Sequence, residues 1–298
     1  MKVFYSEKMV ADQGEQSYGG IQSPSAKKPK QIAEALKSLD NIQFIEPNPL
    51  SIDDFKLSHD PDYVDGVMSL QLENGFGSKS QSVVDSLPYT NGAMYDAAKA
   101  ATLGGPTCAL VSGFHHAGYN GWKNLGWFCT FNGLTIAAYK MLKEGYSKIA
   151  IIDCDMHWGN GTDNILNHEP SFHSNSIHEP ILHISFGRYL HQPQQAERYL
   201  QWLSPKEKVY EALYLHKSNV ILYQAGADVH VNDPYGGVLT TEQIYERDIR
   251  MFSIAKELNI PIAWNLAGGY QIEADGSIDK VIEIHLNTFK ACKQVYGG

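Results

Sequence analysis

The chain has 298 residues, of which 43% are hydrophobic and 19% are charged, the ordinary composition of a globular protein with a sizeable core. No stretch approaches the roughly 18 consecutive apolar residues of a membrane span, so we expect no membrane association. The formal net charge of −9 argues against a nucleic-acid partner, because phosphate-binding surfaces are basic, and it is compatible with a cationic substrate.

The N-terminal stretch MKVFYSEKMVADQG lacks the apolar segment of a signal peptide. The cysteines lie far apart and form no CxxC pair; they are Cys108, Cys129, Cys154 and Cys292. We therefore expect a cytoplasmic protein with reduced thiols. The sequence does not fix the oligomeric state, and a homo-oligomer is compatible with it.

The first half of the chain alternates short apolar runs with helical patterns. In chain order we predict a strand at 2–5, a helix at 25–39, a strand at 41–46, helices at 60–71 and 91–102, and a strand at 106–112. A helix at 132–145 then ends on Gly145, at a C-cap position.

The second half continues the alternation. We predict strands at 147–155, 180–185 and 218–228, a helix at 240–258, a strand at 260–269 and a last helix at 277–294. The helix at 240–258 begins with a capping box made by Thr240 and Gln243. Continuous apolar strands that alternate with helices predict an α/β fold with a mainly parallel sheet covered on both faces. Since no repeat or long linker divides the sequence, we predict one domain over residues 1–298.

Polar residues follow four of the predicted strands, where ligands bind in such sheets. Asp155 and His157 end the strand at 147–155, and their spacing of two places both side chains on the same side of an extended backbone. Asp228 ends another buried strand. Two carboxylates and one imidazole suit zinc with a free position for water, which is typical of a catalytic metal site; iron(II) also fits such a set.

Two further strand ends carry groups suited to proton transfer and hydrogen bonding. His115 and His116 follow the strand at 106–112, and histidine is the side chain best matched to proton transfer near neutral pH. Tyr270 follows Gly268 and Gly269, which allow a loop to approach a ligand closely. The phenol there could donate a hydrogen bond to an oxyanion.

These motifs, in this order, resemble the histone deacetylase and acetylpolyamine amidohydrolase family. The resemblance covers essentially the whole chain and rests on His115-His116, on the segment GWFCTFNG with Phe128, Cys129 and Asn132, on DCDMHWGNG from Asp153 to Gly161, on GAD through Asp233-Pro234, and on Gly268-Gly269-Tyr270. It implies a three-layer arginase/deacetylase-like fold and a metal-dependent amidohydrolase that removes acetyl groups from acetylated amines.

The resemblance also implies a role for each matching residue. Asp155, His157 and Asp228 would bind zinc, and zinc-bound water would attack the acetyl carbonyl. His116 would be the general base and then the general acid, His115 would stabilise charge, and Tyr270 would hydrogen-bond the oxyanion. Asp153 would support His115. Asn160 stands where many members carry an aspartate behind His116, so we expect the two imidazoles to differ in basicity.

The family also binds a structural potassium ion. The matching positions are Asp153, Asp155, His157, Ser185 and Phe186. The segment between Gly161 and Pro180 departs from the family pattern, which leaves a second potassium site open.

Substrate-binding residues are predicted from the same alignment of motifs. They are Phe128 and Gly126 as one tunnel wall, Tyr235 at the rim, Gly268 beside Tyr270, and Asp85 as a substitute for the family's substrate-binding aspartate, which aligns near Ser86. The glycine-rich loop that supplies the other wall is not recognisable. Residues 185–193, SFGRYLHQP, stand in its place, so the tunnel is either more open or closed by Tyr189, His191 or a partner subunit.

The sequence leaves two classes of substrate open. An acetylpolyamine or similar small cationic amine is preferred, and a protein acetyl-lysine is the alternative. A two-metal ureohydrolase is disfavoured because Gly159 and His230 stand where that class needs carboxylates. A non-catalytic module that binds acetylated ligands is disfavoured because the predicted ligands, both histidines and Tyr270 are all present.

Overall fold

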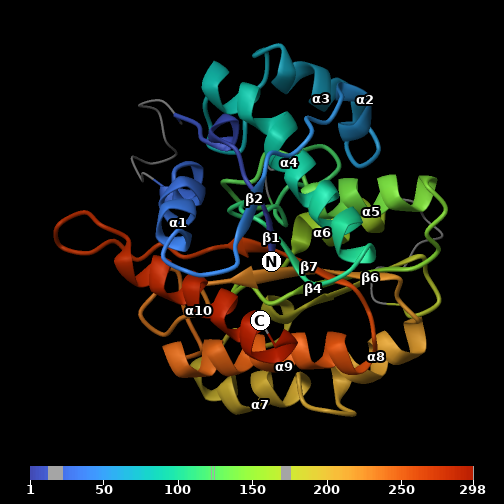
Figure 1. Cartoon of the computed structure of the whole chain (residues 1–298). Helices are drawn as coiled ribbons and strands as arrows, with labels where there is room; N and C mark the ends of the chain where they lie inside the picture. Colours follow the sequence, from blue (N-terminus) through green and yellow to red (C-terminus); the bar gives the residue numbers. More distant parts are fainter. Residues whose placement is uncertain (13–22, 122, 124, 169–175, 298) are drawn as a thin grey trace.

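The computed structural model of the protein describes residues 1–12, 23–121, 123, 125–168 and 176–297. Its centre is a seven-stranded sheet in which every pair of neighbouring strands is parallel, with the order β2-β1-β3-β7-β6-β4-β5 (Figure 1). The strands are β1 Lys2–Phe4, β2 Gln43–Ile45, β3 Thr107–Ala109, β4 Ile149–Asp153, β5 Ile181–Ser185, β6 Val220–Gly226 and β7 Ile262–Ala267. All seven predicted strands occur, and the predicted α/β class with a parallel sheet is confirmed.

Helices cover both faces of the sheet (Figure 1). The α-helices are α1 Lys28–Leu36, α2 Ile52–Phe55, α3 Pro61–Met68, α4 Gln81–Thr102, α5 Gly133–Lys143, α6 Asn160–Leu166, α7 Ala196–Trp202, α8 Lys208–His216, α9 Thr241–Glu257 and α10 Asp279–Tyr296. Short 3-10 helices are η1 Glu7–Met9, η3 Pro24–Ala26, η4 Phe186–Arg188 and η5 Pro193–Gln195. In the described part of the chain, no helix has the length and apolarity needed to cross a membrane.

Two hydrophobic clusters hold the helices on the sheet. Apolar side chains of α1 and α7–α10 pack on one face, and those of α4 and α5 pack on the other. Strands β4 and β6 are buried along their whole length, as expected for central strands covered on both sides. Burial of this apolar surface is the main force that fixes the layers.

Helix α4 differs most from its predicted form. It begins at Gln81, ten residues before the predicted start at Asn91, and it contains Pro88. Proline usually breaks a helix interior because it lacks an N–H and clashes with the preceding turn. Here Ser80 caps the helix and Leu50 N donates to the Pro88 carbonyl, so contacts outside the helix support this segment.

Four helices were not predicted at all: α2, α6, α7 and α8. They contain four to nine residues each, too few for a helical pattern of apolar residues to stand out. Helix α6 matters for function, because it begins at Asn160 directly after β4 and the motif that follows it.

The parallel register brings the carboxyl ends of the strands to one edge of the sheet. Asp153 at the end of β4 lies beside Ser185 of β5 and Gln224 of β6, and Gly226 of β6 lies beside Ala267 of β7. The loops that leave these strands therefore meet at that edge, as the sequence predicted.

Candidate active site

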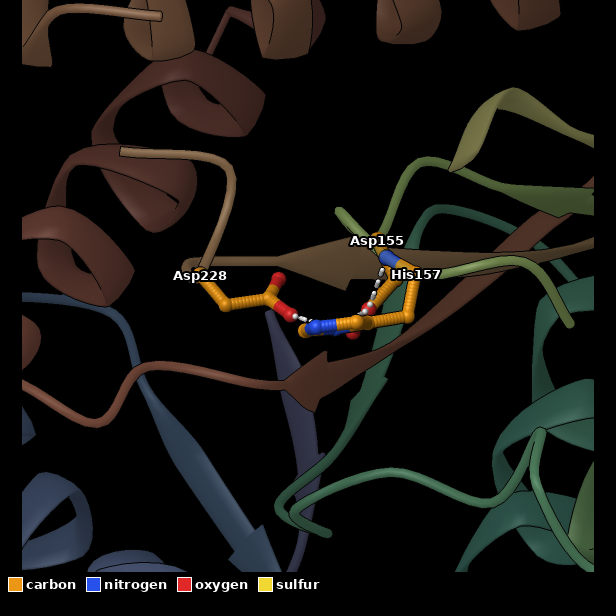
Figure 2. Close-up of side chains that lie close together, drawn as sticks. All are labelled: Asp155, His157 and Asp228. Carbon is orange, nitrogen blue, oxygen red and sulfur yellow. Dashed lines mark hydrogen bonds and ion pairs between the residues drawn. The ribbon is translucent and has the colours of Figure 1, made fainter. Parts of the chain in front are cut away.

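Asp155, His157 and Asp228 come together beyond the ends of β4 and β6 (Figure 2). One ligand atom from each residue lies within 4.8 Å of the others. His157 Nδ1 is 2.8 Å from Asp228 Oδ2 and 3.4 Å from Asp155 Oδ1. Backbone hydrogen bonds fix the turn, since His157 N donates to Asp155 Oδ1 at 3.0 Å and Met156 N donates to Asp228 Oδ1 at 3.1 Å.

The donor set fits a divalent metal ion. Both carboxylates are buried, so their negative charges need a cation close by. Burial and the neighbouring charge of Asp155 raise the pKa of Asp228 to about 7. Burial opposes the charged form of His157, but the hydrogen bonds that Asp155 and Asp228 accept from it raise the pKa of His157 to about 11. A metal ion would take over the charge that the His157 proton supplies, because imidazole binds metals in its neutral form.

His115 and His116 lie side by side next to this cluster, with ring centroids 4.2 Å apart. His115 Nδ1 donates to Asp153 Oδ2 at 2.8 Å, and His116 Nδ1 donates to the amide oxygen of Asn160 at 2.8 Å. Both contacts are the ones that the sequence predicted. Each ring is therefore oriented through Nδ1 and leaves its Nε2 for other partners.

The two histidines differ in basicity. Burial opposes the charged form of His115, but Asp153 and Asp155 outweigh it and raise the pKa of His115. Burial and the positive charge of His115 lower the pKa of His116 to about 3. His116 is therefore neutral near pH 7, and His115 is the more basic member of the pair.

The loop after β7 places Tyr270 at the site. Gly268 and Gly269 both have positive φ, at 52° and 86°, and a side chain at Gly268 would collide with the carboxylate of Asp228. Asp233 holds the loop by accepting a 2.8 Å hydrogen bond from Tyr270 N. Burial and the charges of Asp228 and Asp155 raise the pKa of Tyr270 well above its usual range, so the phenol remains a hydrogen-bond donor.

A cavity of about 80 Å³ joins these groups. Six of the predicted site residues line it: His115, His116, Asp155, Phe128, Gly268 and Tyr270. Gly126 lets the loop pass over His116, because a Cβ at Gly126 would collide with the imidazole. At the rim, the ring of Tyr235 packs edge-on against Tyr270, with centroids 4.9 Å apart.

Asp85, predicted to bind substrate, lies away from the cavity and from the other site residues. It lies on the exposed side of α4, where Gln81 Nε2 donates to it at 2.8 Å, whereas Ser86 lines the cavity. Successive helical residues point about 100° apart, and the prediction missed that Asp85 is helical. Tyr189 and His191, offered as replacements for the missing tunnel wall, do not line the cavity either.

Among the residues predicted to bind potassium, Asp155 and Ser185 contact Asp153. Asp153 accepts hydrogen bonds from Asp155 N at 3.2 Å, Gln224 Nε2 at 3.2 Å and Ser185 Oγ at 3.3 Å, besides His115. The carbonyl of Phe186 accepts from the backbone N–H groups of Tyr189 and Leu190. In the segment predicted to lack the second potassium pattern, residues 169–175 lie outside the described residues.

Two buried cations near the site were missed. His183 Nδ1 is 2.7 Å from Asp163 Oδ1 and its Nε2 is 3.9 Å from Asp153 Oδ2; although burial opposes it, Asp153 and Asp163 raise the pKa of His183 to about 9. Lys28 donates to the carbonyl of Gly268, and burial lowers its pKa to about 8. His183 could have been noticed in the sequence, because it is a histidine inside the apolar run at 180–185. Nothing distinguishes Lys28 from an exposed lysine at a helix start.

Several known proteins are similar to this chain in sequence. A protein-family model described as a histone deacetylase domain matches residues 23–287. An uncharacterised protein of Picosynechococcus is 28% identical over 256 residues, covering 81% of this chain and 82% of that protein. The type-2 histone deacetylase 2 of Dictyostelium discoideum is 30% identical over 215 residues, covering 60% of this chain but only 12% of that protein.

A solved structure extends the likeness to the fold. The acetylpolyamine aminohydrolase of Burkholderia pseudomallei superposes with a TM-score of 0.77 at 15% identity, covering 99% of each chain. At that identity the likeness establishes the three-layer deacetylase fold alone. The match of the family model to most of the sequence establishes more: the chain belongs to the histone deacetylase domain family.

Proposed function

We propose that the protein is a zinc-dependent amidohydrolase that removes acetyl groups from acetylated amines. The observation that carries this proposal is a cavity lined by His115, His116, Tyr270 and Asp155, the last of which belongs to a three-residue cluster of possible metal ligands. An acyl-transfer site of this kind needs a polarising group, a proton carrier and an oxyanion donor, and residues suited to hold or supply each of them lie at the site.

Zinc held by Asp155, His157 and Asp228 would polarise the acetyl carbonyl and acidify a water molecule. His116, neutral near pH 7, accepts a proton from the attacking water at Nε2 and delivers it to the leaving amine nitrogen. His115, whose pKa Asp153 and Asp155 raise against burial, stabilises in its protonated form the negative charge that develops at the carbonyl. The hydroxyl of Tyr270 donates a hydrogen bond to the same oxygen.

The substrate that we favour is an acetylpolyamine or a similar small cationic amine. The net charge of −9 supports long-range attraction of such a molecule. The Burkholderia protein that shares the fold carries the name acetylpolyamine aminohydrolase, so the fold is compatible with this class. A protein acetyl-lysine is the second candidate, supported by the rim, where Trp127 and Tyr235 are each 39% exposed and leave the mouth accessible to a protein chain.

A ureohydrolase remains disfavoured. In the part of the chain that the structure describes, the one group of His, Cys, Asp or Glu side chains that could hold a metal ion is Asp155, His157 and Asp228. His230, at the position where a second-metal carboxylate would stand, contacts Thr241 Oγ1 through Nε2 at 3.1 Å.

A turnover panel tests the proposal. The protein is stripped of metal, reloaded with zinc or iron(II), and supplied with acetylputrescine, acetylspermidines and acetyl-lysine peptides. We expect metal-dependent release of acetate and the highest kcat/KM on a small amine. Highest kcat/KM on the peptides would favour the second candidate, and no hydrolysis of any acetyl amide would reject the proposed function.

We also propose a structural potassium ion near Asp153 and a cytoplasmic location. The buried carboxylate of Asp153 beside Ser185 supports the first, and the four unpaired, buried cysteines support the second. Thermal unfolding in potassium and in sodium salts at equal ionic strength tests the ion; equal melting temperatures would reject it.

A further inference from the structure

We propose that a group of cations and aromatic rings beside the catalytic groups is a docking surface for an acidic segment of a partner protein. The residues that form it, which we call the basic surface, are Trp158, Arg188, Tyr189, Arg198 and Lys208. Docking at this surface does not depend on the reaction that the protein catalyses, so the proposal goes beyond the proposed function.

Aromatic rings and cations alternate along the basic surface. The guanidinium of Arg188 lies 5.0 Å from the ring centroid of Trp158 and 5.4 Å from that of Tyr189. The ammonium of Lys208 lies 4.9 Å from the centroid of Tyr189 and 3.7 Å from that of the buried Trp202. Such contacts hold the long cationic side chains in place, which lowers the entropy that is lost when a partner binds. The surface is therefore preorganised for binding.

The basic surface adjoins the metal-ligand cluster. Gly187 packs against the backbone of His157, because a Cβ at Gly187 would collide with it. Arg188 and Tyr189 come next in the chain. They belong to the segment 185–193, where the glycine-rich loop of the family is not recognisable, so this part of the surface is not one that the resemblance predicts. A partner bound there lies next to the catalytic groups.

The basic surface is accessible to a partner. Trp158 and Tyr189 are 40% and 43% exposed, the side chain of Arg188 is 37% exposed, and Arg198 is exposed. Aromatic residues and arginine are enriched in protein–protein interfaces. Two half-open rings offer apolar contact area that a small inorganic anion cannot cover, and this favours a polypeptide as the partner.

The cations of the basic surface lack carboxylate partners, apart from Arg188, which donates to Asp163 Oδ2 at 3.1 Å. Neither Arg198 nor Lys208 forms an ion pair with another residue that the structure describes. Burial and the positive charge of Arg198 lower the pKa of Lys208. Lys208 is also the first residue of α8, where the helix dipole disfavours a cation. A residue that local electrostatics disfavour is typical of a functional site.

These features fit an acidic polypeptide segment. Complementary charges steer association, and cations without partners gain them when they meet carboxylates. Arg188 and Lys208 flank the ring of Tyr189 and lie within about 10 Å of each other, which an extended chain spans with about three residues. Acidic side chains two or three residues apart can therefore contact both cations. The net charge of −9 disfavours a long polyanion such as nucleic acid, whereas a short acidic segment meets mainly the basic surface.

Binding of defined peptides tests the proposal. A fluorescein-labelled peptide in which glutamate alternates with glycine is titrated with the zinc-loaded protein, and the fluorescence anisotropy is measured. The comparisons are the same peptide with glutamine in place of glutamate and a single-stranded oligothymidine of equal charge. We expect the acidic peptide to bind at least about tenfold more tightly than either, because several ion pairs form, and more weakly as the salt concentration rises. Equal binding of the two peptides, or tighter binding of the oligothymidine, would overturn the proposal.

Two charge reversals locate the bound peptide. Lys208→Glu replaces a cation with a carboxylate, and we expect the affinity for the acidic peptide to fall at least about fivefold. The variant should fold, since a carboxylate is favourable at the start of a helix. Lys143→Glu makes the same change in α5, which packs on the other face of the sheet, and should leave the affinity unchanged. Equal affinities of the two variants would overturn the docking surface. If Lys208→Glu does not fold, Arg198→Glu takes its place.

The outcomes separate this inference from the proposed function. Lys208 does not line the cavity that holds the catalytic groups, so turnover of acetylated amines should be equal in Lys208→Glu and in the unchanged protein. Weaker peptide binding with full turnover supports the docking surface. Intact peptide binding in a protein that hydrolyses no acetyl amide would reject the proposed function and leave the docking surface in place.

Discussion

The side chains behind the two adjacent histidines differ by one functional group. Asp153 stands behind His115 and Asn160 behind His116, each at 2.8 Å. The amide orients its ring without a negative charge, so burial and the charge of His115 lower the pKa of His116, whereas Asp153 and Asp155 raise the pKa of His115 against burial. In the proposed mechanism, the pair therefore divides proton transfer and charge stabilisation between two residues of the same type.

Replacing this amide with a carboxylate tests that division. In Asn160→Asp we expect the pKa of His116 to rise by about 1–3 units, because a nearby negative charge favours the imidazolium. A base must be neutral, so the acidic limb of the kcat profile should move to higher pH. The profile is measured beside that of the unchanged protein at equal zinc content; superimposable limbs would contradict the role of Asn160.

The hydroxyl of Tyr270 is a second single-group test. Tyr270→Phe keeps the ring contacts with Phe128 and Tyr235. We expect kcat to fall at least about 100-fold, as is typical when an oxyanion donor is removed, while zinc content is unchanged. Tyr235→Phe is the control, since it removes a hydroxyl from the neighbouring ring at the rim. Equal activity of Tyr270→Phe and the unchanged protein would refute the role.

Zinc content tests the ligand set directly. Asp228→Ala removes one of the three clustered donors and leaves Asp155 and His157. We expect the purified variant to hold far less than one equivalent of zinc, measured by elemental analysis after dialysis. Asp85→Ala, which removes an exposed carboxylate of α4, should retain the full equivalent. One bound equivalent in Asp228→Ala would exclude Asp228 as a ligand.

At the scale of elements, the loop after β7 depends on close approach of the backbone to the metal-ligand cluster. Gly268 combines a φ of 52° with a Cβ position that falls on the Asp228 carboxylate. Gly276 has a φ of 86° with open space around its Cβ position. Substitutions at these two glycines can therefore distinguish the effect of backbone strain from the effect of a steric collision.

We expect Gly268→Ala to lower stability by about 1–3 kcal/mol more than a strained backbone alone, because the collision displaces Asp228 or the loop. Zinc affinity should fall with it. Thermal unfolding and metal titration of Gly268→Ala are compared with Gly276→Ala, which carries the strain without the collision. Equal effects of the two substitutions would show that close approach to Asp228 is unimportant.

The strands and helices also show where prediction of secondary structure from the sequence succeeds. The strands at 147–155 and 218–228 are long apolar runs that end in polar motifs, and both occur as β4 and β6. The predicted start of α4 was wrong because Pro88 usually breaks a helix. Here, contacts from outside the helix support the segment that contains it. This error also misplaced Asp85, since its exposure follows from the helix.

At the scale of the whole molecule, His59 links the region of α2 and α3 to the body of the protein. It is fully buried; its Nδ1 donates to Gly118 O at 2.8 Å, and Asn132 N donates to its Nε2 at 2.8 Å. These two bonds require the neutral imidazole. Burial lowers the pKa of His59 to about 4.

Stability should therefore fall as pH falls. The unfolded chain takes up the His59 proton near pH 6.5 and the folded protein only near pH 4, so stability present above pH 6.5 is lost between these values, by about 3 kcal/mol in total. His59→Gln keeps one donor and one acceptor and cannot be protonated. Urea unfolding between pH 4 and 7 should show a shallower slope for this variant; parallel slopes would contradict the assignment.

The sequence by itself determined the sheet, the motifs at its strand ends and the family. These features are local: apolar runs, fixed spacings such as Asp155 to His157, and glycines before Tyr270 are legible without any long-range contact. Tertiary structure alone decided which side chains share a cavity. The burial of Lys28 against Gly268, the charge of His183 between Asp153 and Asp163, and the apolar space lined by Met9, Val83 and Leu87 all join segments distant in the chain. Burial and electrostatic environment depend on these contacts, and no local pattern encodes them.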